Sequence, residues 1–134
     1  MDQKSINRSV IDQFRAGGEI TGMHRDRLLL LTTTGARSAH QRTTPMMFHR
    51  DADRVFVIAS NAGAQQDPDW YRNLVAAPEV TVEIGDDTYP ATATPLTGTD
   101  LAARWTEIKQ AYPFFADHET KAGRAIPVVE LTRR

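Results

Sequence analysis

The chain has 134 residues, which predicts a single domain over residues 1–134 because domains commonly contain about 100–150 residues. Its formal net charge of −1, with 40% hydrophobic and 25% charged residues, is that of an ordinary globular protein and gives no general attraction for nucleic acid. Cysteine is absent from the sequence, which excludes disulfides, thiolate nucleophiles and cysteine-ligated metal sites within it and fits a cytoplasmic protein.

The first predicted element is an amphipathic helix over residues 5 to 16, within an N-terminal helix and cap of residues 1–18. Ile6, Val10 and Phe14 recur at four-residue intervals and so share one side of the helix. We expect this side to cover a sheet. The apolar stripe is narrow, so peripheral contact with a membrane is only an alternative, and no segment suits a membrane span or a signal peptide.

A basic connection between two strands follows. Residues 28 to 33, LLLLTT, predict a strand buried on both faces, and residues 43 to 48 return to strand character. The connection from Thr34 to Arg42 holds a glycine, hydroxyl groups and two arginines, so backbone N–H donors and guanidinium groups could bind one anion. It lacks the Gly-Lys-Ser/Thr run of a P-loop and the later glycines of a dinucleotide site. On spacing alone, a solvated turn remains the alternative.

The rest of the chain alternates short apolar runs with turns and helical patterns. Val80, Val82 and Ile84 alternate with polar residues before a turn at residues 85–87, which predicts a hairpin. Further strands are predicted at residues 55–59, 88–94 and 126–131, and helices at residues 68–76, capped by Asp67, and 100–112, followed by a short aromatic segment at residues 114–121. Six strands with peripheral helices favour a mainly β, α+β fold with a small antiparallel-rich barrel.

Three ordered blocks of sequence cover most of the chain. They are LLLLTTTGARSAHQRTTPM at residues 28–46, SNAGAQQDPDWYRNL with PEVTV at residues 60–74 and 78–82, and YPFFADH with GRAIPV at residues 112–118 and 123–128. Together these blocks resemble the deazaflavin-dependent nitroreductase and quinone reductase family. The resemblance implies the split β-barrel of flavin-reductase-like proteins, with about six mostly antiparallel strands.

The resemblance also implies a reaction. In such a protein, reduced coenzyme F420, a deazaflavin with a phosphate and an oligoglutamate tail, transfers a hydride to a small hydrophobic acceptor such as a quinone, an enone or a nitro compound. The protein then supplies position, electrostatics and exclusion of water. Flavin mononucleotide (FMN) is the alternative cofactor, and a barrel that binds a flavin or a fatty acid without turnover is the alternative function. We expect a monomer rather than a dimer, and no nucleic-acid partner.

The matched motifs imply cofactor-binding residues position by position. Arg37 and Arg42 would face the phosphate. The other implied contacts are Ser38, Thr44, Pro45 and Met46 on one wall and Ala59, Ser60, Asn61, Gly63, Trp70 and Asn73 on the opposite wall and at the end of the pocket. For Thr44, Met46 and Ala59, ordinary barrel core is the alternative. Two departures reduce the positive charge, because Ala36 replaces a family arginine and Asn61 replaces a lysine.

The implied substrate site differs from that of nitroimidazole-reducing members. Phe115, His118 and Met47 stand where those members have tyrosines, and Tyr112 keeps its hydroxyl group. We therefore expect weak activity on bicyclic nitroimidazoles and better activity on quinones or unsaturated carbonyl compounds. His118 could donate the proton that completes the reduction, since histidine titrates near neutral pH. Tyr112 and Ser60 are the other candidate catalytic residues, and a surface histidine is the alternative for His118.

The remaining histidines do not predict a metal site. His24, His40 and His49 show no ligand spacing typical of a bound metal ion. The sequence therefore predicts no bound metal ion.

Overall fold

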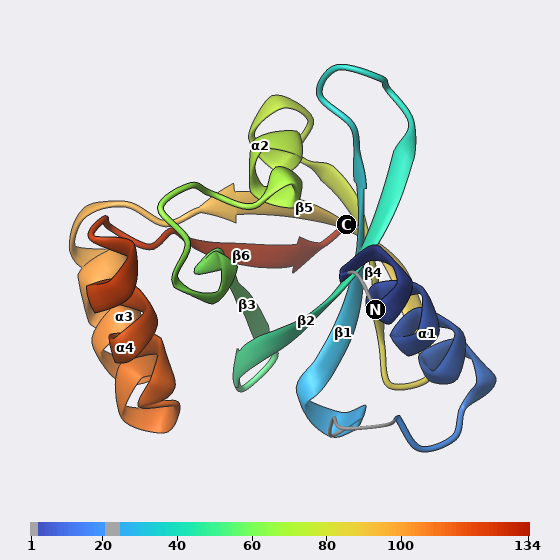
Figure 1. Cartoon of the computed structure of the whole chain (residues 1–134), viewed down its shortest axis with the longest axis horizontal. Coiled ribbons are helices and arrows are strands. Elements are labelled where there is room, and N and C mark those ends of the chain that lie inside the picture. The colour runs from blue at the N-terminus through green and yellow to red at the C-terminus, as the bar shows by residue number, and fades with distance from the viewer. Residues whose placement is uncertain (1–2, 21–24) are drawn as a thin grey trace.

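The structure is a computed structural model that describes residues 3–20 and 25–134 (Figure 1). In these residues, six strands with antiparallel pairing close into a barrel in the order β1-β2-β3-β6-β5-β4. The strands are β1 (Leu28–Thr34), β2 (Gln41–Asp51), β3 (Arg54–Ile58), β4 (Glu79–Ile84), β5 (Asp87–Pro95) and β6 (Val128–Arg133). The helices are α1 (Gln3–Ala16), α2 (Asp69–Ala76), α3 (Gly98–Ala111) and α4 (Phe114–Ala122), with short 3-10 turns η1 (Arg25–Arg27) and η2 (Asn61–Gly63). The predicted mainly β fold is confirmed.

Some predicted boundaries were wrong. The segment after Pro113 forms helix α4, because Phe115 and Ala122, seven residues apart, place apolar groups on one helical face. Asp67 does not cap α2, whose N-cap position is Pro68, because the Asp67 carboxylate instead pairs with Arg124. The second strand is also longer than predicted, because its polar first residues still pair with β1 along the hairpin.

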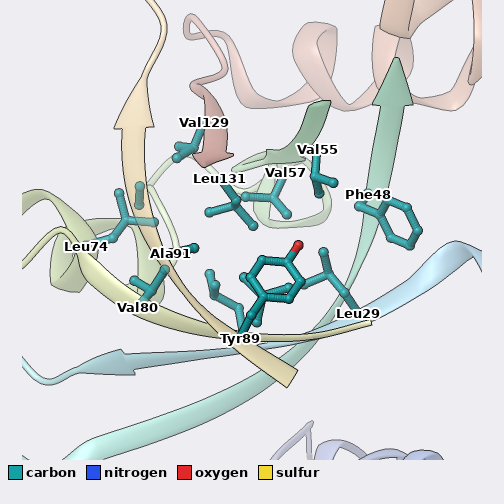
Figure 2. Close-up of a cluster of buried hydrophobic side chains, with 13 residues drawn as sticks. Leu29, Phe48, Val55, Val57, Leu74, Val80, Tyr89, Ala91, Val129 and Leu131 are labelled. Atoms are coloured by element: carbon teal, nitrogen blue, oxygen red, sulfur yellow. The ribbon is translucent and has the colours of Figure 1, made fainter. Parts of the chain in front are cut away.

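The interior of the barrel holds the main hydrophobic core (Figure 2). Side chains alternate between the two faces of a strand, so Leu29 and Leu31 of β1 point inward while Leu28 and Leu30 point outward. β1 is therefore buried on both faces, as its apolar run predicts. Every strand contributes inward side chains, and Leu74 of α2 joins them.

Helices cover two separate outer surfaces of the barrel (Figure 1). Val10, Ile11 and Phe14 of α1 pack against the outward leucines of β1. The α3–α4 pair covers β3 and β6 through a second apolar cluster that includes Phe56 and Phe115. None of the helices in the described ranges is long and apolar enough to cross a membrane.

The β1–β2 hairpin ends in a tight turn next to α2 (Figure 1). Gly35 N donates to His40 O at 2.7 Å. A Cβ at Gly35 would lie 2.6 Å from Ser38 Oγ, so this position needs glycine unless the turn rearranges. Ala36 N donates to Asn73 Oδ1 at 3.0 Å, which ties the turn to α2. The hairpin and α2 therefore form two connected walls.

Candidate functional site

A groove of about 630 Å³ lies between α1, the β1–β2 hairpin and α2. Four residues that the sequence motifs implied for cofactor binding line it, namely Arg42, Thr44, Trp70 and Asn73. They come from elements that are separate in the chain and meet only in the folded barrel. This groove is the candidate functional site, and we call it the cationic groove because arginines of α1 and β2 line it.

Strand pairing and one buried amide set the shape of the cationic groove. Arg42 pairs with Thr33 of β1, and Thr44 lies two residues along β2 on the same face. Asn73 Nδ2 donates to Thr33 Oγ1 at 3.3 Å, while Asn73 Oδ1 accepts from Ala36 N. Asn73 is only 8% exposed, so its amide holds α2 against both the strand and the turn.

The two arginines predicted to bind an anion together lie in different places. Both Arg37 and Arg42 are exposed, and neither guanidinium group has an ion-pair or hydrogen-bond partner among the described residues. Arg42 lines the cationic groove, whereas Arg37 lies in the turn and does not. Ser38 also lies in the turn, where its Oγ accepts from His40 N at 3.2 Å. Only Arg42 of this pair faces the cavity.

The residues that follow Thr44 lie on different faces of β2. Met46 packs against the barrel core. Pro45 and Met47 pair with the outward leucines of β1, and cross-strand partners share a face, so they lie on the side that α1 partly covers. The structure therefore does not place Pro45 and Met47 on the same wall as Thr44.

The loop after β3 supplies less of the groove than the motifs implied. Ala59 and Ser60 are buried and do not line the groove. Asn61 has a φ of 51°, and its Nδ2 donates to a carbonyl of the same loop at 3.0 Å. A Cβ at Gly63 would lie 2.9 Å from Lys121 Cδ, so the glycine permits close packing of η2 on α4. Asn61 and Gly63 therefore shape the loop.

Arg124 holds this loop in place, a role that the sequence analysis did not assign. Its Nη1 donates to Asp67 Oδ1 at 2.6 Å. Its other N–H groups donate to the carbonyl oxygens of Ala59, Ala64 and Gln66 at 3.3, 3.2 and 3.1 Å. The planar guanidinium group can make these contacts at once because it carries five donors. The signal was present, since Arg124 lies in the third sequence block.

The candidate catalytic and substrate residues gather at the junction of this loop with α4. Ser60 Oγ lies 3.1 Å from His118 Nδ1. The His118 ring meets the edges of Phe114 and Phe115, and Tyr112 meets Phe115 edge-on with 6.2 Å between ring centroids. Phe115 is only 5% exposed, whereas Phe114, which the sequence analysis did not single out, is 38% exposed. We call Tyr112, Phe114, Phe115 and His118 the aromatic cluster, and Phe114 is its exposed ring.

A polar network joins β2 to α3 next to the aromatic cluster. His49 Nε2 lies 2.5 Å from Glu107 Oε1, and the His49 ring meets Tyr112 edge-on. Arg104 Nη1 donates to Glu107 Oε1 at 3.2 Å and to Asp51 Oδ2 at 2.6 Å. The hydrogen bond from His49 is the largest cause that lowers the pKa of Glu107. Burial opposes this shift, and the charge of Arg104 adds to it.

The histidines within the described residues do not form a metal-binding group. Over residues 3–20 and 25–134, no group of three or more His, Cys, Asp or Glu side chains could hold a metal ion. His40 lies in the hairpin turn and His49 in the network with Glu107. His24 lies outside the described residues.

Known proteins resemble the chain over nearly its whole length. Residues 6–133 match the family model described as F420H2-dependent quinone reductase. The chain is 37% identical over 109 residues to an F420H2-dependent quinone reductase of Mycobacterium tuberculosis strain H37Rv, a match that covers 79% of this chain and 73% of that relative. The solved structure of an F420-H2 dependent reductase (FDR-A) is 36% identical with a TM-score of 0.72, covering 82% of this chain and 99% of the other. Another chain, solved as a domain-swapped dimer, is 31% identical with a TM-score of 0.73, covering 96% of this chain and 92% of the other.

Proposed function

Because this chain belongs to the F420H2-dependent quinone reductase family, we propose that it is an oxidoreductase that reduces a small apolar acceptor at the expense of reduced coenzyme F420. Quinones, enones and nitro compounds are the acceptor classes. The bound coenzyme supplies a hydride from its deazaflavin ring. The observation that carries the proposal is the cationic groove, which Arg42, Thr44 and Trp70 line together.

The residues of the cationic groove fit a ligand that is aromatic at one end and anionic at the other. Trp70 packs against the barrel core and so offers a fixed apolar surface. Arg42 can donate two parallel N–H groups to a phosphate or carboxylate. The volume of about 630 Å³ falls within the range of about 300–1,000 Å³ that is usual for small-molecule sites.

His118 is the proposed proton donor. Reduction of a quinone to a hydroquinone needs one hydride and one proton, and histidine can supply the proton near neutral pH. Ser60 Oγ contacts Nδ1 of the ring, which orients the imidazole. Ser60 is therefore proposed as a positioning residue, and Tyr112, held against His49 and Phe115, as the other polar group of the acceptor site.

The proposed acceptor preference follows from the side chains of the aromatic cluster. Phe115, His118 and Met47 stand where the family resemblance implies tyrosines in nitroimidazole-reducing members, and the exposed ring of Phe114 provides an apolar surface. A planar apolar acceptor can stack on such a ring. We propose better activity with quinones or unsaturated carbonyl compounds than with bicyclic nitroimidazoles.

A barrel that binds a flavin such as FMN, or a fatty acid, without turnover is the second candidate. Two uncharged positions favour it. Ala36 and Asn61 stand where the family resemblance implies an arginine and a lysine, and the Asn61 amide bonds to its own loop. Loss of those charges would weaken the binding of a polyanionic coenzyme.

Fluorescence titration with oxidised coenzyme F420, with FMN measured in parallel, separates these candidates. We expect coenzyme F420 to bind, and Arg42→Ala to weaken binding by about tenfold or more, since a charge-assisted contact contributes about 1.5–3 kcal/mol. The control is Arg27→Ala, because Arg27 is exposed and does not line the groove. Binding no tighter than about millimolar, or a preference for FMN, would support the second candidate. An equal loss of affinity and thermal stability would assign Arg42 a packing role.

We also propose a cytoplasmic monomer. The apolar residues Val10, Ile11 and Phe14 of α1 are buried against β1, which leaves them unable to enter a lipid surface in this conformation. Membrane-peripheral placement would require α1 to detach. Light scattering during gel filtration tests the monomer, and the domain-swapped chain with 31% identity gives the alternative outcome to look for.

A further inference from the structure

Helix α1 contributes arginines to the cationic groove. Asn7, Arg8, Ile11 and Arg15 all line it, and their three- and four-residue spacings place them on one side of the helix. Arg42 lines the same cavity from β2. Guanidinium groups from the N-terminal helix and from the hairpin therefore border one space. Figure 1 shows α1 lying alongside the strands at this side of the barrel.

The two arginines of α1 differ in how firmly they are held. Arg15 makes a paired contact with Glu83, with Nε and Nη2 at 3.0 and 2.9 Å from the two carboxylate oxygens. This contact fastens the end of α1 to β4. Among the described residues, Arg8 has Asp12 as its one ion-pair partner, at 3.5 Å, and the two side chains are 75% and 62% exposed. An exposed pair of this kind contributes little free energy, so Arg8 can exchange Asp12 for a bound anion.

The loop and the turn provide less positive charge at this site than the arginines of α1 and β2. Asn61 has no charge, and its amide bonds within its loop. Ala36 has no charge, and its N–H donates to Asn73. Arg37 does not line the cavity. Asp69 adds one negative charge to the lining, so the positive charge that recognises an anion in the groove must come from Arg42 and from the arginines of α1.

We propose that Arg8 binds the anionic extension of the ligand in the cationic groove, together with Arg42. Arg42 contacts the phosphate, and Arg8 contacts carboxylates farther along the extension. The ligand class is an extended polyanion attached to a planar aromatic ring. This inference rests on the proposed function, because it assigns a further binding residue to the same cofactor.

Titration with three deazaflavins tests the assignment. One lacks the phosphate and the glutamates, one has the phosphate alone, and one has the oligoglutamate tail. We expect Arg8→Ala to weaken binding of the glutamylated form by about threefold to tenfold at low salt and to leave the form without phosphate unchanged. Added salt should reduce the difference between wild type and the variant, because an exposed charge is screened.

Asp12→Asn is the opposing variant. It removes the carboxylate that pairs with Arg8 and that repels a bound anion. We expect it to tighten binding of the glutamylated form by about twofold to threefold. Arg27→Ala, an exposed arginine away from the groove, is the charge-matched control and should change none of the three affinities.

The outcomes separate this inference from the proposed function. Unchanged affinity of Arg8→Ala for all three forms would overturn the role of Arg8 while leaving the reductase proposal intact. Equal weakening for all three forms, with a lower melting temperature, would make Arg8 a packing residue and would also overturn the assignment. If the wild-type protein binds none of the three forms, both the inference and the proposed function fail.

Discussion

The side chains of Ser60 and His118 lie 3.1 Å apart, between Ser60 Oγ and His118 Nδ1, although 58 positions separate them in the chain. This contact joins the loop after β3 to α4. It fixes the orientation of the imidazole that we propose as proton donor, and it gives the first of the following predictions.

We expect His118→Phe to lower kcat for quinone reduction by about 100-fold, because general acid catalysis commonly contributes about 10²–10⁴-fold. The affinity for coenzyme F420 should change little, since His118 does not line the cationic groove. Ser60→Ala should have a smaller effect on kcat and should shift its pH profile. The measurement is the pH dependence of kcat, with His40→Phe in the hairpin turn as control. An unchanged pH profile in His118→Phe would exclude this histidine as the donor.

Substitution of Arg124 should loosen the loop that follows β3. Arg124→Lys keeps the charge but loses the planar set of donors that contacts Asp67 and several carbonyl groups. We expect a loss of about 1.5–3 kcal/mol in the free energy of unfolding, measured with urea. Hydrogen exchange should increase at residues 59–67 first. Arg133→Lys is the control, because the exposed pair of Arg133 with Asp87 lies on β6 and β5, away from this loop. Similar exchange changes in both variants would contradict a specific role for Arg124.

The neighbouring residues Phe114 and Phe115 should respond differently to truncation. Phe115 is 5% exposed within the apolar cluster under α3 and α4, so Phe115→Ala should cost about 3–5 kcal/mol of stability. Phe114 is largely outside that cluster, so Phe114→Ala should fold nearly as well and raise KM for a quinone. Urea unfolding and steady-state kinetics measure the two effects. An unchanged KM in Phe114→Ala would remove this ring from the acceptor site.

The free energy of unfolding should decrease at acidic pH, in part because Glu107 becomes protonated. The hydrogen bond from His49 is the main cause that lowers the pKa of Glu107 below its ordinary value of 4.5. Because the pKa of Glu107 is lower in the folded state than in the unfolded state, its ionised carboxylate stabilises the fold at pH values above the unfolded-state pKa. This contribution is lost as the pH falls from 4.5 through the lowered pKa. Glu107→Gln should therefore be less stable near neutral pH and lose less stability on acidification. The effect is small because the Glu107 side chain is 46% exposed.

Urea unfolding over about pH 3 to 7 measures this dependence. Glu79→Gln is the control, since the exposed Glu79 pairs with the exposed Arg134 at the other end of the barrel strands. A pH profile of Glu107→Gln that parallels the wild type would show that the contact with His49 does not contribute.

The barrel could be predicted from sequence because its signals are local. The apolar run of β1, the alternation in β4 and the turn at Gly85 each determine structure within a few residues. Helix α4 could not be predicted from a local pattern, because its apolar face is completed by contacts with α3, β3 and β6. Its helical form depends on tertiary packing.

The candidate site could be predicted only in part. The motifs named Arg42, Thr44 and Trp70, and the fold brings them to one groove. The motifs alone did not say which face of the strand each residue occupies, so Pro45 was assigned to the wall that Thr44 occupies, although adjacent strand residues point in opposite directions. Arg8 lies 34 positions before Arg42 by residue number and reaches the groove only because α1 docks on β1.

Closure of the sheet restricts how copies of this protein can combine. Each of the six barrel strands in the described ranges has a hydrogen-bonded neighbour on both sides over part of its length, so a foreign peptide cannot join the sheet at those paired positions without displacing a resident strand. Exchange of strands between copies would first require the closed barrel to open. Such an exchange should therefore be slow at ordinary temperatures and should accelerate under mildly denaturing conditions, where opened forms are more populated.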